Sequence, residues 1–248
     1  MVDAKALSEE IRQDLQIVTE QLLRHPYLQA LEEGKIGREN LRLFAGEQYN
    51  TITSDLKSVA YLISRFGSAP SRDFFLGILQ GERAAWDALL MFAHALGLSE
   101  TQLREHEPLP GSHAYTCYMA WLALYASDTE IAAAYLINFP AWGQNCGRLS
   151  RILKERFGLR EKEVAYFDLF ASPRATLFSK GSIAAPSRGW SNARPGYSRP
   201  TSSCTGIYSI GPLVFNAGGR NGTSCLPYEQ NSKRRKARRS SRRAADEV

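Results

Sequence analysis

Apolar residues recur at intervals of three and four positions from about residue 8 to residue 170, which is the spacing of amphipathic helices. Glycine and proline breaks divide this region into segments. The pattern predicts helices over 8–25, 28–33, 38–66, 71 to 94 or 96, 113–126, 129–157 and 161–170. No alternating strand pattern of useful length interrupts the series, so the sequence predicts an all-α protein.

The predicted helix ends follow from particular residues. Ser8 and Ser71 stand where N-caps are expected, and the residue before Pro26 is pushed out of the helical region. The segment 108–111 is predicted as a loop. Pro140 lies inside the predicted helix 129–157, where it removes a backbone donor and clashes with the preceding turn. We therefore expect a kink near Asn138.

The composition changes abruptly after Pro173. Residues 174–248 hold 14 basic and 3 acidic residues, and 25 of these 75 residues are Gly, Pro or Ser. The sequence therefore predicts a helical domain over 1–173 and a basic, disordered tail over 174–248. The run 233–243 is the only stretch suited to nucleic acid, and we favour a solvated tail without a partner. A frameshifted or spliced end would also explain the abrupt change.

The remaining composition excludes several protein classes. The longest unbroken apolar stretch, 118–126, has nine residues, whereas a membrane-spanning helix needs about 20. Acidic residues among the first 25 positions argue against a signal peptide. The four cysteines form no CxxC pair, so we expect no zinc site. We expect reduced thiols and a cytoplasmic location.

Polar residues interrupt three apolar stripes. Gln48, Glu82 and Asn138 each stand at a helical spacing among apolar neighbours, and the segment 113–126 adds a row of tyrosines. A buried amide without a partner costs about 1–3 kcal/mol, and a lone carboxylate costs more. Two interpretations stay open. These side chains either satisfy one another inside a bundle core or line a pocket for a polar ligand.

Four segments resemble one known family in order and spacing. They are HPYLQAL from residue 25, GKIGRENLRLFAGEQY from 34, AYTCYM from 114 and YLINFPAWGQNCGRL from 135. Over about residues 8–173 the chain resembles the TenA/thiaminase II family of the haem-oxygenase-like fold. The resemblance implies a helical bundle around a small-ligand pocket, homo-oligomers, and hydrolysis of thiamin or of its aminopyrimidine breakdown products. It does not imply a DNA-binding protein.

The resemblance also assigns site residues. The family's pocket aspartate falls at Gln48, its pocket tyrosine matches Tyr115, and the nucleophilic cysteine of the thiaminase type falls at Asn138. An amide is no nucleophile, and Cys146 lies two turns later. The family's catalytic glutamate belongs to a final helix that has no equivalent in 174–248, so the final helices of the bundle are expected to be missing.

The sequence therefore leaves Glu82 as the only stripe carboxylate placed for general acid or base work. We expect Gln48, Tyr115, Asn138 and Trp142 to bind a small heteroaromatic ligand, without a cofactor, and the hydrolase activity to be degraded. A non-catalytic binding protein of the same fold is the alternative. A di-iron oxidase of this fold is disfavoured because Trp86 stands where a histidine ligand would be useful.

Overall fold

The computed structural model describes residue 9 and residues 11–171, the side chains of 136 and 137 excepted. These residues form helices and no strand, which confirms the all-α class. The helices are α2 (Gln16–Leu23), α3 (Pro26–Glu32), α4 (Arg38–Arg65), α5 (Arg72–Ala95), α6 (Glu100–Arg104), α7 (Pro110–Tyr125), α8 (Asp128–Phe157) and α9 (Glu161–Ala171). The predicted tail over 174–248 and its basic run 233–243 lie outside the described residues.

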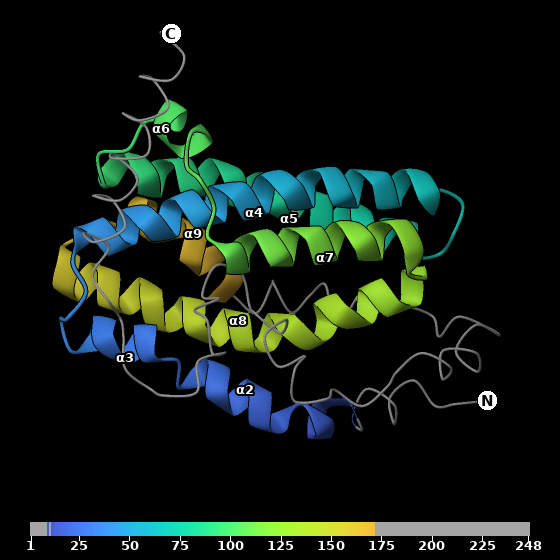
Figure 1. Cartoon of the computed structure of the whole chain (residues 1–248), viewed down its shortest axis with the longest axis horizontal. Helices are drawn as coiled ribbons and strands as arrows, with labels where there is room; N and C mark the ends of the chain where they lie inside the picture. Colours follow the sequence, from blue (N-terminus) through green and yellow to red (C-terminus); the bar gives the residue numbers. More distant parts are fainter. Residues whose placement is uncertain (1–8, 10, 172–248) are drawn as a thin grey trace, which may run out of the picture. The chain divides into compact units, whose positions relative to one another are not determined.

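The long helices pack as a bundle. Helix α4 contacts α5 and α7, while α8 contacts α2, α3 and α9, and α9 also contacts α5 (Figure 1). One apolar cluster joins α4, α5, α8 and α9 and includes Phe44, Phe92 and Phe167. A second cluster, with Phe75 and Ile131, joins α4, α5, α7 and α8. Burial of the apolar helix faces in these two clusters is the main contribution to the stability of the folded chain.

Local chemistry marks several helix ends, of which the stop at Gly158 and the break at His25-Pro26 were predicted. Ser127 and Glu130 form a capping box at the start of α8, in which each side chain accepts a backbone N–H of the other residue. Gly158 ends α8 in the left-handed region at φ +66°. His25 precedes α3, and its Nδ1 accepts the Tyr27 N–H at 3.1 Å. These are local contacts, which explains why the sequence alone indicates them.

Other boundaries differ from the prediction. Helix α7 begins at Pro110, three residues earlier than predicted, because proline is suited to the first helical position. Ser71 does not cap α5 with its side chain, since its hydroxyl donates to Asp128 at 2.6 Å. Helix α6 was not predicted at all. The first helix is interrupted at Leu15, and its predicted cap, Ser8, lies outside the described residues.

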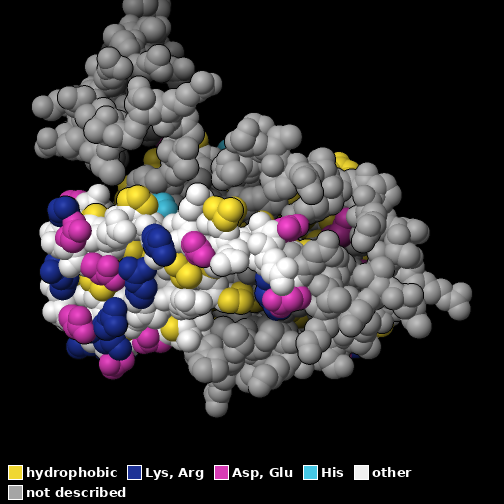
Figure 2. Space-filling model, turned by 90° about the horizontal axis from the view of Figure 1, so that it is seen from below, with side chains coloured by type: hydrophobic (Ala, Val, Ile, Leu, Met, Phe, Trp, Pro, Cys, Tyr) yellow, Lys and Arg dark blue, Asp and Glu magenta, His cyan; other side chains and the backbone are white. Residues whose placement is uncertain are grey.

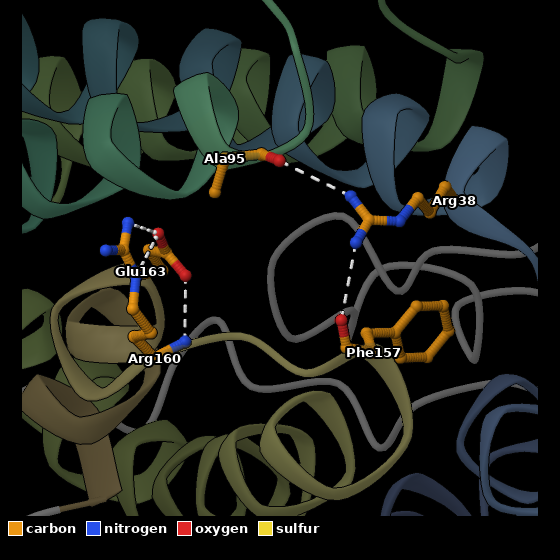
Figure 3. A network of polar contacts seen from close by, with 5 residues as sticks. All are labelled: Arg38, Ala95, Phe157, Arg160 and Glu163. Carbon is orange, nitrogen blue, oxygen red and sulfur yellow. Dashed lines mark hydrogen bonds and ion pairs between the residues drawn. The ribbon is translucent and has the colours of Figure 1, made fainter.

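Arg38, at the start of α4, connects the C-terminal ends of two other helices. Its guanidinium donates to the carbonyl of Ala95 at 3.4 Å and to that of Phe157 at 3.3 Å (Figure 3). A cation at these ends also interacts favourably with both helix dipoles. Arg160 and Glu163 pair in the adjacent first turn of α9, where the carboxylate accepts the Arg160 N–H at 2.8 Å. The contacts hold the ends of α4, α5 and α8 together.

Helix α8 carries Pro140 in its interior and remains one continuous helical segment. Figure 1 shows that α8 changes direction along its length, in agreement with the expected effect of an internal proline. The position of the bend relative to Asn138 stays a prediction.

The described surface shows no dominance of one charge sign on the face seen in Figure 2. Dark blue Lys and Arg side chains alternate there with magenta Asp and Glu side chains. Across residues 9 and 11–171, no helix combines the length and apolar character that crossing a membrane requires.

Candidate functional site

A cavity of about 40 Å³ lies between five helices of the bundle. All five residues that the sequence analysis assigned to a site line it. Its lining consists of Gln48, Thr51, Ile52 and Asp55 from α4, Glu82 from α5, Tyr115 from α7, Tyr135, Asn138, Phe139 and Trp142 from α8, and Tyr166 and Phe170 from α9. The volume suits roughly three water molecules, so a ring-sized ligand requires the lining to move apart.

Asp55 is a buried carboxylate that the sequence analysis did not identify. The expectation that Glu82 is the only carboxylate on these stripes is wrong, because Asp55 is 3% exposed and faces the cavity. The helical stripe after Ile52 can continue at either 55 or 56, since spacings of three and four both fit. Packing selects Asp55 for the interior and leaves Leu56 half-buried.

The two carboxyl groups of the cavity have raised pKa values. Burial raises the pKa of Asp55 to about 7, although a hydrogen bond from Tyr115 acts in the opposite direction. Burial also raises the pKa of Glu82 well above its usual range, and the charge of Asp55 raises it further. Tyr115 favours the ionised form of Asp55, because its hydrogen bond to a carboxylate is the stronger one. With its pKa near 7, Asp55 is partly ionised near neutral pH, and its charge further disfavours ionisation of Glu82.

Two phenols border the carboxyl groups. Tyr115 donates to Asp55 with 3.2 Å between the phenol oxygen and Oδ2. The Tyr135 hydroxyl is buried and has no hydrogen-bond partner among the described residues. Burial raises the pKa of both phenols, and the charge of Asp55 raises it further. Both tyrosines therefore stay protonated and can act as hydrogen-bond donors toward the cavity.

Further polar atoms of the lining are buried without a protein partner. Gln48 accepts a 2.6 Å hydrogen bond from the Tyr166 hydroxyl through Oε1. Its Nε2 is buried without a partner in the described part of the chain, as are Thr51 Oγ1 and Asp55 Oδ1. Such atoms cost about 1–3 kcal/mol each unless water or a ligand satisfies them. Their gathering in one cavity favours the pocket interpretation of the stripe residues over the self-satisfied core.

Aromatic rings also belong to the lining. Trp142 and Phe170 contact edge to face with their centroids 5.8 Å apart, and Phe170 also contacts Tyr166. Gly143 allows this arrangement, because a Cβ at that position would lie 2.7 Å from the carbonyl oxygen of Phe170. Helix α9 can therefore approach α8 closely only with glycine at this point. The result is an apolar surface on which a flat ring can stack.

Asn138 and Cys146 lie in different environments on α8. Asn138, the position that the resemblance assigns to a nucleophile, is half-buried in the cavity wall. Cys146 is fully buried and does not belong to the lining. Burial raises the pKa of the Cys146 thiol well above its usual range, which disfavours the reactive thiolate. Cys146 therefore does not replace a nucleophile at position 138.

The cavity is acidic. Its lining contains two carboxyl groups and no Lys, Arg or His among the described residues. Within the same part of the chain, no three side chains of His, Cys, Asp or Glu gather as a metal site would require. Carboxyl groups that lack a cationic partner favour ligands that donate hydrogen bonds or carry positive charge.

A second buried carboxylate of α4, Glu47, is satisfied outside the cavity. Glu47 is 2% exposed, and its Oε1 lies 2.7 Å from His106 Nε2 and accepts the Leu109 N–H at 3.0 Å. Gly46 makes room for this contact, since a Cβ there would lie 2.5 Å from the His106 ring. Glu47 thus fixes the loop before α7, whereas Asp55 accepts a bond from Tyr115 through Oδ2 and its Oδ1 has no partner among the described residues.

Comparison with known proteins agrees with this architecture. The family model described as "TENA/THI-4/PQQC family" matches residues 12–167. The chain is 29% identical over 164 residues to a protein named "4-aminobenzoate synthase" from Chlamydia pneumoniae, covering 62% of this chain and 70% of that protein. It is 26% identical over 164 residues to a protein of the same name from Chlamydia trachomatis serovar D, covering 62% and 69%.

Solved structures show the same fold. A domain of unknown function with a heme oxygenase-like fold from Shewanella denitrificans os217 superposes with a TM-score of 0.60 at 14% identity, covering 73% of this chain and 77% of that one. A TenA homologue protein from P. horikoshii OT3 superposes with a TM-score of 0.58 at 16% identity, covering 70% and 81%. The expected haem-oxygenase-like fold is therefore confirmed.

Proposed function

The chain belongs to the TENA/THI-4/PQQC family, and on that premise we propose that its cavity binds a small, amine-bearing heteroaromatic molecule of the aminopyrimidine type. The observation that carries this proposal is the pairing of two carboxyl groups with an aromatic wall. An aminopyrimidine presents an amine and a ring nitrogen on one edge, which matches carboxyl and amide side chains. Its flat ring matches Trp142.

In this proposal, the polar groups of the lining form hydrogen bonds with the amine and the ring nitrogens of the ligand. The Asp55 and Glu82 carboxyls accept from the amine or from a protonated ring nitrogen, and the free Nε2 of Gln48 donates to an unprotonated one. The cost of leaving these atoms unsatisfied is recovered on binding. That gain opposes the cost of moving the lining apart from its present volume of about 40 Å³.

The acidic lining also indicates what the cavity rejects. The relatives named 4-aminobenzoate synthase are 29% and 26% identical, and their name includes a carboxylated aromatic amine. A benzoate carboxylate would lie beside Asp55 and Glu82 without a basic side chain among the described lining residues. Ionised Asp55 would repel that carboxylate, and no cation of the described lining would compensate its buried charge. We therefore place aminopyrimidines above 4-aminobenzoate as ligands.

The reaction that fits such a ligand is hydrolysis of its exocyclic amine. Water adds to the ring carbon, Asp55 accepts the proton of the water, and Glu82 donates a proton to the departing ammonia. Their unequal pKa values fit these functions near neutral pH. Because Asn138 provides no nucleophile, the covalent route is closed, and we expect slow turnover. A binding protein without turnover is the second candidate, favoured by the same Asn138.

Calorimetric titration of the full chain with two ligands tests the binding proposal. Hydroxymethyl aminopyrimidine should bind near pH 7, and 4-aminobenzoate should give at least tenfold weaker binding or no heat. Binding of 4-aminobenzoate alone would contradict the proposal, because it would require a cationic group that the described lining lacks.

A further inference from the structure

The cavity is much smaller than the ring that we propose as its ligand. Its volume is about 40 Å³, whereas a single water molecule needs roughly 10–15 Å³ of such space. An aminopyrimidine enters only when the lining moves apart, but an ion the size of a water molecule fits the present volume. The closed cavity is therefore suited to a ligand much smaller than a ring.

Three buried oxygen atoms of the lining lack a hydrogen-bond partner within the described part of the chain. They are Thr51 Oγ1, Asp55 Oδ1 and the hydroxyl oxygen of Tyr135. These residues are 6%, 3% and 5% exposed, so bulk water does not satisfy them. Each of the three oxygens can accept a hydrogen bond. A small ligand with several N–H donors could therefore satisfy them together.

The charge of the lining favours a cation over a neutral molecule. Asp55 is partly ionised near neutral pH, and no Lys, Arg or His belongs to the described lining. Since the charge of Asp55 disfavours ionisation of Glu82, a single positive charge is enough to balance the cavity. Aromatic rings such as Trp142 border the same space, and the face of an aromatic ring attracts a cation.

From these observations, we propose that the closed cavity binds an ammonium ion, and that ammonium and the aminopyrimidine exclude one another from it. Ammonium is as small as water, carries one positive charge and donates through all of its N–H groups. The proposal rests on the proposed function in one respect, because the hydrolysis described above releases ammonia in this cavity. Ammonium retained beside Asp55 then delays entry of the next substrate molecule.

Potassium is the main competitor, since it has the same charge as ammonium and a similar radius. A potassium ion requires oxygen atoms on all sides in place of its hydration water. Half of the described lining residues are aromatic, so the cavity does not offer such a complete shell. Potassium also has no N–H group to donate to the oxygens of Thr51 and Asp55. The lining therefore favours ammonium.

Thermal unfolding of the full chain in ammonium chloride and in potassium chloride tests the binding. We expect a dissociation constant on the order of 10–100 mM, the range for a ligand of one non-hydrogen atom. At roughly pH 8, where Asp55 is mostly ionised, roughly 0.5 M ammonium chloride should give a Tm at least about 2 °C above that in equal potassium chloride. Equal Tm values in the two salts would overturn the proposal.

Two aspartate variants locate the effect. Asp55→Asn should abolish the difference in Tm between the two salts, because it removes the negative charge and stays neutral at this pH. Asp87→Asn is the matched control, since Asp87 is an exposed carboxylate of α5, and it should keep the difference. If Asp55→Asn does not fold, Thr51→Val replaces it and should weaken ammonium binding severalfold. A difference that persists in the cavity variant would place the ion elsewhere and overturn the proposal.

Competition separates this proposal from the proposed function. Calorimetry should show weaker binding of hydroxymethyl aminopyrimidine in ammonium chloride than in potassium chloride, by at least threefold at roughly 0.5 M salt. Equal affinity in both salts would overturn the mutual exclusion. If the pyrimidine binds in neither salt, the proposed function fails, and the difference in Tm between wild type and Asp55→Asn still decides whether ammonium binds.

Discussion

Tyr115 donates a hydrogen bond to Asp55, with 3.2 Å between the phenol oxygen and Oδ2, and this contact distinguishes the two carboxyl groups of the cavity. Glu82 lines the same cavity, where burial and the charge of Asp55 both raise its pKa. One group therefore ionises before the other. This inequality supplies an acid and a base from two otherwise similar residues.

The raised pKa of Asp55 predicts a specific pH dependence of stability. Its folded pKa of about 7 exceeds the unfolded value of 3.8, so the folded state binds the proton more tightly. The contribution of protonated Asp55 is complete below pH 4 and is lost as the pH rises to about 7. Asp55→Asn stays neutral at every pH. It should equal wild type in unfolding free energy near pH 4 and exceed it by a few kcal/mol above pH 7.

Urea unfolding of both proteins at roughly pH 4.5, 6 and 8 measures how this difference grows as wild-type Asp55 loses its proton. Asp87→Asn is the control, because Asp87 is an exposed carboxylate that pairs with Arg83 on α5. A constant difference between Asp55→Asn and wild type at all three pH values would show that Asp55 does not titrate in this window.

Two tyrosine-to-phenylalanine substitutions should have unequal effects. Tyr166→Phe removes the donor that satisfies Gln48 Oε1 and should lower the unfolding free energy by about 1–3 kcal/mol. Tyr135→Phe removes a buried hydroxyl without a partner among the described residues, so it should be neutral or stabilising. Equal destabilisation by both, measured by thermal unfolding at one pH, would mean that Tyr135 has a partner of comparable strength.

Two glycines of α8 provide a matched pair for the approach of α9. In Gly143→Ala the new methyl group would lie 2.7 Å from the Phe170 carbonyl oxygen, so we expect a loss of about 1–3 kcal/mol. In Gly147→Ala the nearest atom would be 3.5 Å away, so we expect a gain of about 0.5–1 kcal/mol from the higher helix propensity of alanine. Denaturant unfolding measures both, and similar effects for the two variants would contradict the close contact.

Catalysis should depend on Glu82 and be limited by Asn138. Wild type should release ammonia from an aminopyrimidine slowly, and Glu82→Gln should reduce the rate by about 10²–10⁴, the range for a general acid or base. Asn138→Cys should give thiazole release from thiamin only if position 138 is placed for attack. Fast wild-type turnover that survives Glu82→Gln would show that Glu82 is not the acid.

The fold was largely predictable because its signals are local. The Ser127–Glu130 capping box and Gly158 mark their helix ends within a few residues of sequence. Helix α6 is not predicted, because five residues are too few to show a helical periodicity. The capping box of Ser99 and Gln102 is the sequence signal that could have indicated it.

The site was predictable only in part. The helical spacing of apolar residues identified Gln48, Glu82 and Asn138 as polar residues on inward faces. The structure places all three around one cavity. Asp55 was missed because periodicity does not decide between positions 55 and 56. Tyr166 was missed because its contact with Gln48 spans 118 residues and depends on how α9 docks. Such choices are made by packing between helices and not by local sequence.

The most direct test of the central claim is calorimetry of hydroxymethyl aminopyrimidine binding to wild type, Asp55→Asn, Glu82→Gln and the control Asp87→Asn at one pH near 7. If the cavity carboxyls hold the amine edge of the ligand, the two cavity variants should bind at least tenfold more weakly, and Asp87→Asn should bind like wild type. Wild-type affinity in both cavity variants would contradict the account, because the ligand would then lie somewhere other than beside Asp55 and Glu82.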